Sequence, residues 1–336
     1  MSHSDPERVT LSHGAGGQAT RGLVEQVFER EFGARVAGDD SATIDLGGGP
    51  VAFTTDSFVV DPIFFPGGDI GRLAVAGTVN DLLTAAARPV ALSISVIIEE
   101  GLELETLRRI ARSVRNTADE SGAAVVTGDT KVVPRGSADR LFITTSGVGA
   151  VMRPGVSGAA VRPGDRLILT GTAGDHGTAV MLAREDLLSG DAVASDTAPL
   201  TDIVMSLIDS GCEVRAMRDP TRGGIASALN EIARQSGVCI RIEETAVPVK
   251  PPVAAACEAL GLDPLQMANE GKMLVFAAAP DAERALSVVR ACRYGEEARI
   301  IGEVTPGPAG RVTARTSFGT YRIVDMPSGE LLPRIC

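Results

Sequence analysis

The chain has 336 residues, more than one compact domain usually holds, so two domains of about 150 residues each are the expected arrangement. Its formal net charge of −11 argues against nucleic acid as a partner, because an acidic surface repels phosphate backbones. No stretch reaches the roughly 18 apolar residues of a membrane helix, no apolar secretory segment follows Met1, and the five cysteines include no Cys-x-x-Cys pair. We therefore expect a cytoplasmic protein with reduced thiols, no membrane partner and no zinc site.

In the first half of the chain, strand-like and helix-like runs alternate. Apolar residues predict strands at 51–55, 90–98, 123–127 and 141–151. Apolar residues at helical spacing predict helices at 71–87 and 103–121. The stretch 152–165 is rich in glycine and proline and is expected to be a linker.

The second half begins a new series of elements. It contains predicted strands at 166–170, 238–242 and 273–277 and predicted helices at 178–188, 223–236, 252–260 and 281–290. This order favours the α+β class, with mixed sheets in two domains at 1–153 and 160–322. Residues 323–336 hold two prolines and a glycine, which predict a flexible C-terminal tail that carries Cys336.

Four aspartates end or interrupt separate elements of the first half. They are Asp40, Asp56, Asp81 and Asp129. Mg²⁺ prefers oxygen ligands and bridges carboxylates to phosphates, so aspartates that converge would hold metal ions for a phosphate substrate. Taken singly, each aspartate is better explained as the cap of a turn or helix. Asp81 fits that explanation least, because a carboxylate inside an apolar helix is costly without a partner.

A glycine-rich segment precedes the first predicted helix. It contains His13, Gly14, Gly16 and Gly17. Glycines let backbone N–H groups approach phosphate oxygens, and a helix N-terminus adds a favourable dipole. The segment is therefore a candidate nucleotide contact, although a flexible N-terminal loop would have the same composition.

Asp129 lies in a predicted turn between two apolar strands. Gly128, Thr130 and Lys131 complete this turn, and Lys131 would neutralise charge that develops on a transferred phosphoryl group. The plain alternative is a solvated lysine in a hairpin.

Further polar groups lie at the starts of predicted helices or inside them. Asp175 and His176 belong to a Gly-Asp-His-Gly turn, and Asp219 and Arg222 belong to an Arg-Asp-Pro-Thr-Arg segment before two glycines. Asn80 precedes Asp81. All five are candidate contacts to a nucleotide or a reacting group, and all are also compatible with helix capping and turn formation.

Two residues are candidates for the chemistry itself. Glu270 immediately precedes a predicted strand and is suited to be a general base, although an exposed turn glutamate is the simpler explanation. Cys336 is the last residue and therefore has no reason to be a core residue. Its own terminal carboxylate disfavours the thiolate.

Taken together and in this order, these motifs closely resemble the HypE family of hydrogenase maturation proteins. The family belongs to the ATP-using superfamily of aminoimidazole ribonucleotide synthetase and selenophosphate synthetase. The resemblance extends from about His13 to Cys336. The aspartate motifs point to the superfamily, and the terminal Pro-Arg-Ile-Cys points to HypE.

The resemblance implies an aminoimidazole ribonucleotide synthetase-like fold, a homodimer joined through its first domains, and ATP with Mg²⁺ bound in the first domain. It further implies that a HypF-type carbamoyltransferase loads a carboxamide onto Cys336. The chain would dehydrate this group to an S-cyanide, and a HypC–HypD scaffold would receive the cyanide for iron. In that reaction Glu270 is the expected base, Lys131 would stabilise the leaving phosphate, and His176 is a further candidate base.

Two alternatives stay open at this point. Selenophosphate synthetase-like enzymes carry a reactive Cys or selenocysteine near the glycine-rich loop, where this chain has His13 and its first cysteine is Cys212. A non-catalytic carrier that only shuttles a group on Cys336 would not need the aspartate motifs.

Overall fold

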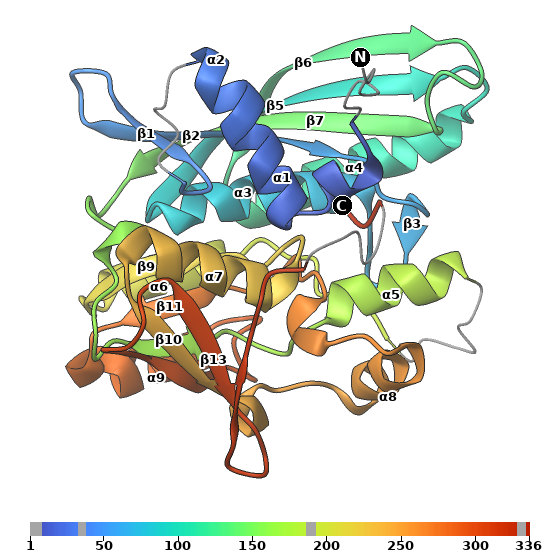
Figure 1. Cartoon of the computed structure of the whole chain (residues 1–336). Helices are drawn as coiled ribbons and strands as arrows, with labels where there is room; N and C mark the ends of the chain where they lie inside the picture. Colours follow the sequence, from blue (N-terminus) through green and yellow to red (C-terminus); the bar gives the residue numbers. More distant parts are fainter. Residues whose placement is uncertain (1–8, 33–37, 186–192, 328–333) are drawn as a thin grey trace, which may run out of the picture.

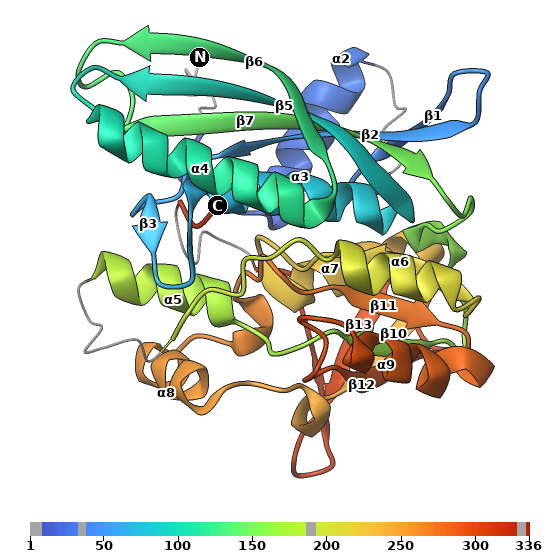
Figure 2. The same cartoon turned by 180° about the vertical axis from the view of Figure 1, so that it is seen from behind.

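A computed structural model describes residues 9–32, 38–185, 193–327 and 334–336. It contains one large sheet in each half of the sequence, with helices between the two sheets (Figures 1 and 2). Each sheet combines parallel and antiparallel strand pairs, so the predicted α+β architecture with mixed sheets is confirmed. Within the described residues, no helix has the length and apolar character needed to cross a membrane.

The first sheet has five strands in the order β1-β2-β7-β5-β6. Their bounds are β1 Ala42–Asp45, β2 Pro50–Phe58, β5 Ala87–Glu99, β6 Ala124–Val133 and β7 Leu141–Val151. One face of the sheet packs on α3 (Ile70–Thr84) and α4 (Leu104–Ser121), so alternate residues of β7 are buried. α4 is the crossover that joins the parallel pair β5 and β6.

The second sheet has seven strands in the order β14-β13-β10-β12-β8-β11-β9. The bounds are β8 Arg166–Leu169, β9 Val214–Arg218, β10 Cys239–Glu243, β11 Leu274–Ala277, β12 Arg299–Thr305, β13 Arg311–Arg315 and β14 Tyr321–Ile323. The helices of this half are α5 Asp175–Arg184, α6 Thr201–Asp209, α7 Gly224–Ser236, α8 Pro251–Leu260 and α9 Ala282–Ala291. β11 is buried along its whole length because it lies between two strands and is covered on both faces.

The two halves share one apolar core. Val79 and Leu83 of α3 belong to the same buried cluster as Ile203 and Leu207 of α6. α3 is apolar on almost every side because it lies between the first sheet and the second half (Figure 1). The domains are therefore packed against each other rather than merely linked.

Short segments complete the described chain. They are η1 Leu11–Gly14, α1 Gln18–Leu23, η2 Val24–Glu29, α2 Arg30–Phe32, the hairpin strands β3 Phe64–Phe65 and β4 Gly68–Asp69, and the short helices η3 Gly158–Ala160, η4 Glu244–Ala246, η5 Pro264–Gln266 and η6 Ala279–Asp281. The C-terminal residues lie between the two halves, close to α1 (Figure 1).

The predicted turn at residues 128–131 is wrong. β6 continues through it, with Gly128 opposite Ile94 and Asp129 opposite Ser95. A Cβ on Gly128 would lie 2.2 Å from the Ile94 carbonyl oxygen, so glycine here permits close approach of two strands rather than a turn.

Candidate active site at the domain interface

Three carboxylates from three parts of the chain meet at the interface between the halves. Asp40 precedes β1, Asp81 lies in α3 and Asp219 follows β9. Each offers an oxygen atom, and these atoms lie within 4.8 Å of one another. Thr54 of β2 orients the group, since its hydroxyl donates to the Asp81 carboxylate at 2.8 Å.

The carboxylates repel one another in a buried setting. Burial raises the pKa of Asp40 to about 6, although Arg218 opposes the shift through a 2.6 Å contact. Burial and then the neighbouring carboxylates raise the pKa of Asp81 and Asp219 well above the usual range. The Asp40 Oδ2 atom is buried and has no hydrogen-bond partner among the described residues.

These observations fit a divalent cation. A hard ion would take the unpartnered oxygen and neutralise the charge that the carboxylates cannot neutralise themselves. Asp56 adds a fourth carboxylate nearby, since its charge contributes to the raised pKa of Asp81 and of Asp219. A Cβ on Gly77 of α3 would lie 3.9 Å from the Asp56 carboxylate, which places Asp56 on the α3 face of the first sheet.

Cys336 lies in the same interface, beside Glu270. Burial and then the charge of Glu270 raise the pKa of the Cys336 thiol well above its usual range, and Arg222 opposes the shift. Glu270 is 2% exposed, and its Oε1 atom has no hydrogen-bond partner among the described residues. Burial raises the pKa of Glu270 well above that of an ordinary glutamate, and Asp219 and Asp56 add to the shift.

The end of the chain is docked rather than free. The Val59 backbone N–H donates to the Cys336 oxygen at 3.3 Å, and the Asp61 N–H donates to the Arg334 carbonyl at 3.2 Å. Ile335 is 3% exposed and belongs to an apolar cluster that combines residues of the first half with Val180 and Ala268 of the second. Arg334 forms ion pairs with Asp61 and Asp139. The sequence predicts a mobile tail, and in the structure its last three residues are held in the interface.

The glycine-rich loop lies against the start of that tail. Arg222 donates to the Gly14 carbonyl at 2.9 Å, and a Cβ on Gly16 would lie 2.6 Å from the Cβ of Arg222. A Cβ on Gly17 would lie 2.4 Å from the Pro327 carbonyl oxygen. Gly16 and Gly17 therefore permit close approach to Arg222 and to the tail.

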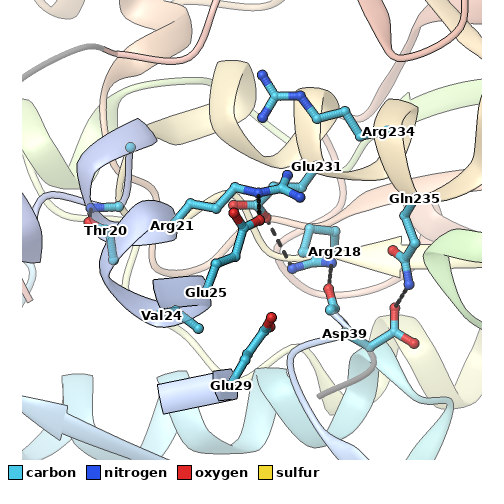
Figure 3. Close-up of a pocket in the computed structure, with 13 residues that line it drawn as sticks. Thr20, Arg21, Val24, Glu25, Glu29, Asp39, Arg218, Glu231, Arg234 and Gln235 are labelled. Carbon is cyan, nitrogen blue, oxygen red and sulfur yellow. Dashed lines mark hydrogen bonds and ion pairs between the residues drawn. The ribbon is translucent and has the colours of Figure 1, made fainter. Parts of the chain in front are cut away.

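A pocket of about 490 Å³ opens between this loop and α7 (Figure 3). Gly16, Gly17, Asp39 and Arg218 contribute to its lining. Figure 3 shows Arg218 between Glu231 and Asp39. Since Arg218 also contacts Asp40, the pocket adjoins the carboxylate cluster.

Other predicted site residues are placed apart from this cluster. Strand register puts Asp129, Ser95, Thr144 and Ser57 in one row on the outward face of the first sheet, opposite to the face of Asp56. Lys131 is exposed and forms an ion pair with Asp129. Gly128 and Thr130 belong to the same exposed strand. Within one chain, the structure thus corrects the expectation that this segment joins the other aspartates.

Three further candidates have structural partners. Asn80 donates to the Ala198 carbonyl at 3.1 Å and accepts from the Leu200 N–H at 2.9 Å, so it joins the two halves. Asp175 is buried and paired with Lys250 at 2.7 Å. His13 contacts Thr10 through Nδ1.

Sequence reasoning missed several groups that shape the site. Arg218 stands in the same motif as Asp219 and Arg222, and its position next to Asp219 could have indicated that it belongs to the site. Asp196 accepts the N–H groups of Glu270 and Gly271 at 3.2 and 3.3 Å and lies 3.6 Å from Lys272. No local pattern distinguishes Asp196, because its role depends on a loop packing against residues far along the chain.

Two family models match the chain: AIR synthase related protein, N-terminal domain, over residues 38–151, and AIR synthase related protein, C-terminal domain, over residues 162–315. The fold and the carboxylate cluster therefore define a two-domain protein of the AIR synthase-related superfamily. The carbamoyl dehydratase HypE of Rhodobacter capsulatus is 50% identical over 336 residues, and the match covers 98% of each chain.

Two solved structures are similarly close. A HypE–HypF complex has a chain with 47% identity and a TM-score of 0.86, covering 91% of this chain and 99% of that one. A hydrogenase maturation protein HypE in complex with ATP has 45% identity and a TM-score of 0.84, covering 98% and 100%. The chain belongs to the HypE family of carbamoyl dehydratases, which serve hydrogenase maturation.

Proposed function

We propose that this chain dehydrates an S-carboxamide on Cys336 to an S-cyanide at the expense of ATP. The observation that supports the proposal most directly is the docking of Cys336 beside Glu270, within reach of the charge of Arg222 and Asp56. A terminal cysteine in this position presents its own substrate to the site. The cyanide would then become a ligand of the iron in a [NiFe]-hydrogenase.

The reaction balances without an oxidant or reductant. The carboxamide oxygen attacks the γ-phosphorus of ATP and ADP leaves, which converts a poor leaving group into phosphate. Glu270 accepts a proton from the amide nitrogen as the carbon–oxygen bond breaks and the nitrile forms. The amide oxygen departs in inorganic phosphate, and the two amide protons pass to the base and to solvent.

The arrangement also excludes water. Ile335 fills an apolar cluster beside the thiol, so the activated group would be shielded from hydrolysis. Arg222 carries a fixed positive charge next to Cys336 and is suited to receive charge that develops on the departing phosphate. Lys131, assigned that role from the sequence, lies on the outward sheet face, so we favour Arg222 within one chain.

We propose Asp40, Asp81 and Asp219 as the ligands of Mg²⁺, with Asp56 close by. When bound, the ion would polarise the phosphate oxygens and neutralise their charge. Support for ATP as the substrate comes from the relative crystallised with ATP. The pocket between the glycine-rich loop and α7 adjoins the three aspartates and has a volume suited to part of a nucleotide.

The test of this function is the intact mass of the Cys336-carbamoylated chain before and after addition of Mg-ATP. We expect a loss of one water per carboxamide, with ADP and phosphate as products. The variant Cys336→Ala should take up no carbamoyl group and show no mass change, while it keeps the fold. If the carbamoylated protein retains its mass when ATP is present, the dehydration proposal is wrong.

The partners follow from the chemistry of the group that is moved. A HypF-type carbamoyltransferase would load Cys336, and the complex of a relative with HypF supports this assignment. A HypC–HypD scaffold would receive the cyanide, which rests on the family resemblance alone. We propose that Cys336 leaves the site for both steps, because the docked residue is partly buried between the two halves.

We also propose a homodimer through the outward face of the first sheet. Phe53, Ile97 and Val148 on this face are each about two fifths exposed, which leaves an apolar surface uncovered. A two-fold contact would bury it and place Asp129 and Lys131 in the interface. We expect a dimer by sedimentation at micromolar protein and a monomer for Phe53→Lys. A monomeric parent chain would contradict the proposal.

A further inference from the structure

We propose that His176 is a positioning residue that latches the chain end, holding the Ile335 carbonyl so that Cys336 stands beside Glu270. The inference rests on the proposed function, because it explains how the substrate-bearing thiol is placed. It also reassigns His176, a candidate catalytic residue from the sequence, to a role that acts through Ile335.

The hydrogen bonds fix the tautomer of the ring. The Nε2 atom lies 2.7 Å from the Ile335 carbonyl oxygen, which only accepts hydrogen bonds, so Nε2 carries the proton. The Nδ1 atom is then an acceptor, and the Ser195 hydroxyl, 2.8 Å away, donates to it.

A second hydroxyl completes the chain of donors. The Thr197 Oγ1 atom lies 2.6 Å from the Ser195 oxygen, and the Thr197 N–H also donates to that oxygen at 3.1 Å. Since the Ser195 hydroxyl donates its hydrogen to His176, its oxygen accepts from the Thr197 hydroxyl. The direction therefore runs from Thr197 through Ser195 and His176 to the chain end, and each acceptor has its donor.

The surroundings keep the ring neutral and still. His176 is fully buried in the first turn of α5, and the ring of Phe65 lies edge-on to it at 5.4 Å. Burial lowers the pKa of His176, while Asp196 and the Ile335 carbonyl oppose the shift. Nε2 donates to the Ile335 carbonyl in the neutral and in the protonated ring, and protonation would only reverse the direction of the Ser195 contact.

The contacts also argue against a role of His176 as the acid or base of the reaction. Both ring nitrogens are already occupied, one by Ile335 and one by Ser195. Arg184, at the other end of α5, adds a donor to the neighbouring Arg334 carbonyl at 2.7 Å. α5 thus holds two successive carbonyls of the chain end, which is the behaviour of a docking element.

The test uses the full chain without ATP or carbamoyl group, so it is independent of the dehydration reaction. The rate of Cys336 alkylation by iodoacetamide is measured by mass spectrometry of the tail peptide. In His176→Ala we expect alkylation to rise about fivefold, the equivalent of one typical hydrogen bond. The dehydration rate should also fall, by the smaller factor by which the docked fraction decreases, because alkylation reports the undocked chain end and dehydration the docked one.

His176→Gln is the rescue variant, since its amide nitrogen reaches the place of Nε2 and donates but cannot act as an acid or base. We expect near-normal rates of alkylation and dehydration in His176→Gln. The shorter side chain of His176→Asn should not reach Ile335, so this variant should show faster alkylation and slower dehydration, as His176→Ala does. Ser195→Ala is the substitute test in case His176→Ala fails to fold. It should also raise the alkylation rate and lower the dehydration rate. Normal alkylation in His176→Ala, or slow dehydration in His176→Gln with a protected thiol, would overturn the latch.

Discussion

Glu270→Gln should slow the loss of water from the Cys336 carboxamide by about 10² to 10⁴, the usual contribution of a general base. The substitution keeps the size and hydrogen-bonding shape of a side chain that is 2% exposed. It removes a carboxyl group beside the thiol whose pKa is raised well above that of an ordinary glutamate by burial, a perturbation typical of catalytic acids and bases. Mass spectrometry of the tail peptide after addition of Mg-ATP measures the rate.

Two comparisons make this result specific. Carbamoyl transfer to Cys336 should stay normal in Glu270→Gln, because in our proposal loading takes place with the tail outside the site. Glu303→Gln, a change on the half-exposed surface of β12, should leave the dehydration rate unchanged. If Glu270→Gln loses water at the rate of the parent chain, the base is another residue, and Asp81 is the next candidate.

Asp81→Asn should lower Mg-dependent ATP turnover by about 10² or more, because a metal ion supplies several kcal/mol of charge stabilisation and each 1.36 kcal/mol is tenfold in rate. The asparagine keeps an acceptor for the Thr54 hydroxyl and removes a carboxylate charge from a cluster of three. The fold should therefore persist or gain stability in the absence of metal, since a buried repulsion is relieved.

Thermal unfolding separates the two effects. Mg²⁺ should raise the melting temperature of the parent chain and of Asp119→Asn, a change in an exposed surface pair, but not that of Asp81→Asn. An Asp81→Asn variant with the magnesium response and turnover of the parent chain would remove Asp81 from the metal site.

Local patterns predicted much of the fold. The predicted strand at 141–151 matches β7 Leu141–Val151, and the helix at 103–121 matches α4 within one residue at its start. These segments have clear periodicity or a glycine at the end. The strands β12 to β14 and the helix α6 were not predicted, although α6 has an apolar face at helical spacing and β13 alternates between buried and less buried residues. The predicted helix at 178–188 extends beyond the described residues.

The site was predicted only in part, because residue types can be read from the sequence but long-range packing cannot. The residue types at Asp40, Asp81 and Glu270 indicated their chemistry, but burial of Glu270 depends on the loop of Asp196, far away in sequence. Asn80 resembled a ligand because it stands beside Asp81, yet its side chain joins two domains. Asp129 and Asp56 lie on opposite faces of the first sheet. The face on which Asp129 lies is set by β6, which continues where a turn was expected.

The core shared by α3 and α6 determines which part of the molecule can move. Opening the two halves like a hinge would expose Val79, Leu83 and their partners to water and break the Asn80 contacts, at a cost of several buried side chains. Releasing the chain end exposes Ile335 and breaks a few hydrogen bonds. Cys336 therefore becomes accessible when the chain end is released. A partner that binds the released end would set the rate of turnover without deforming either domain.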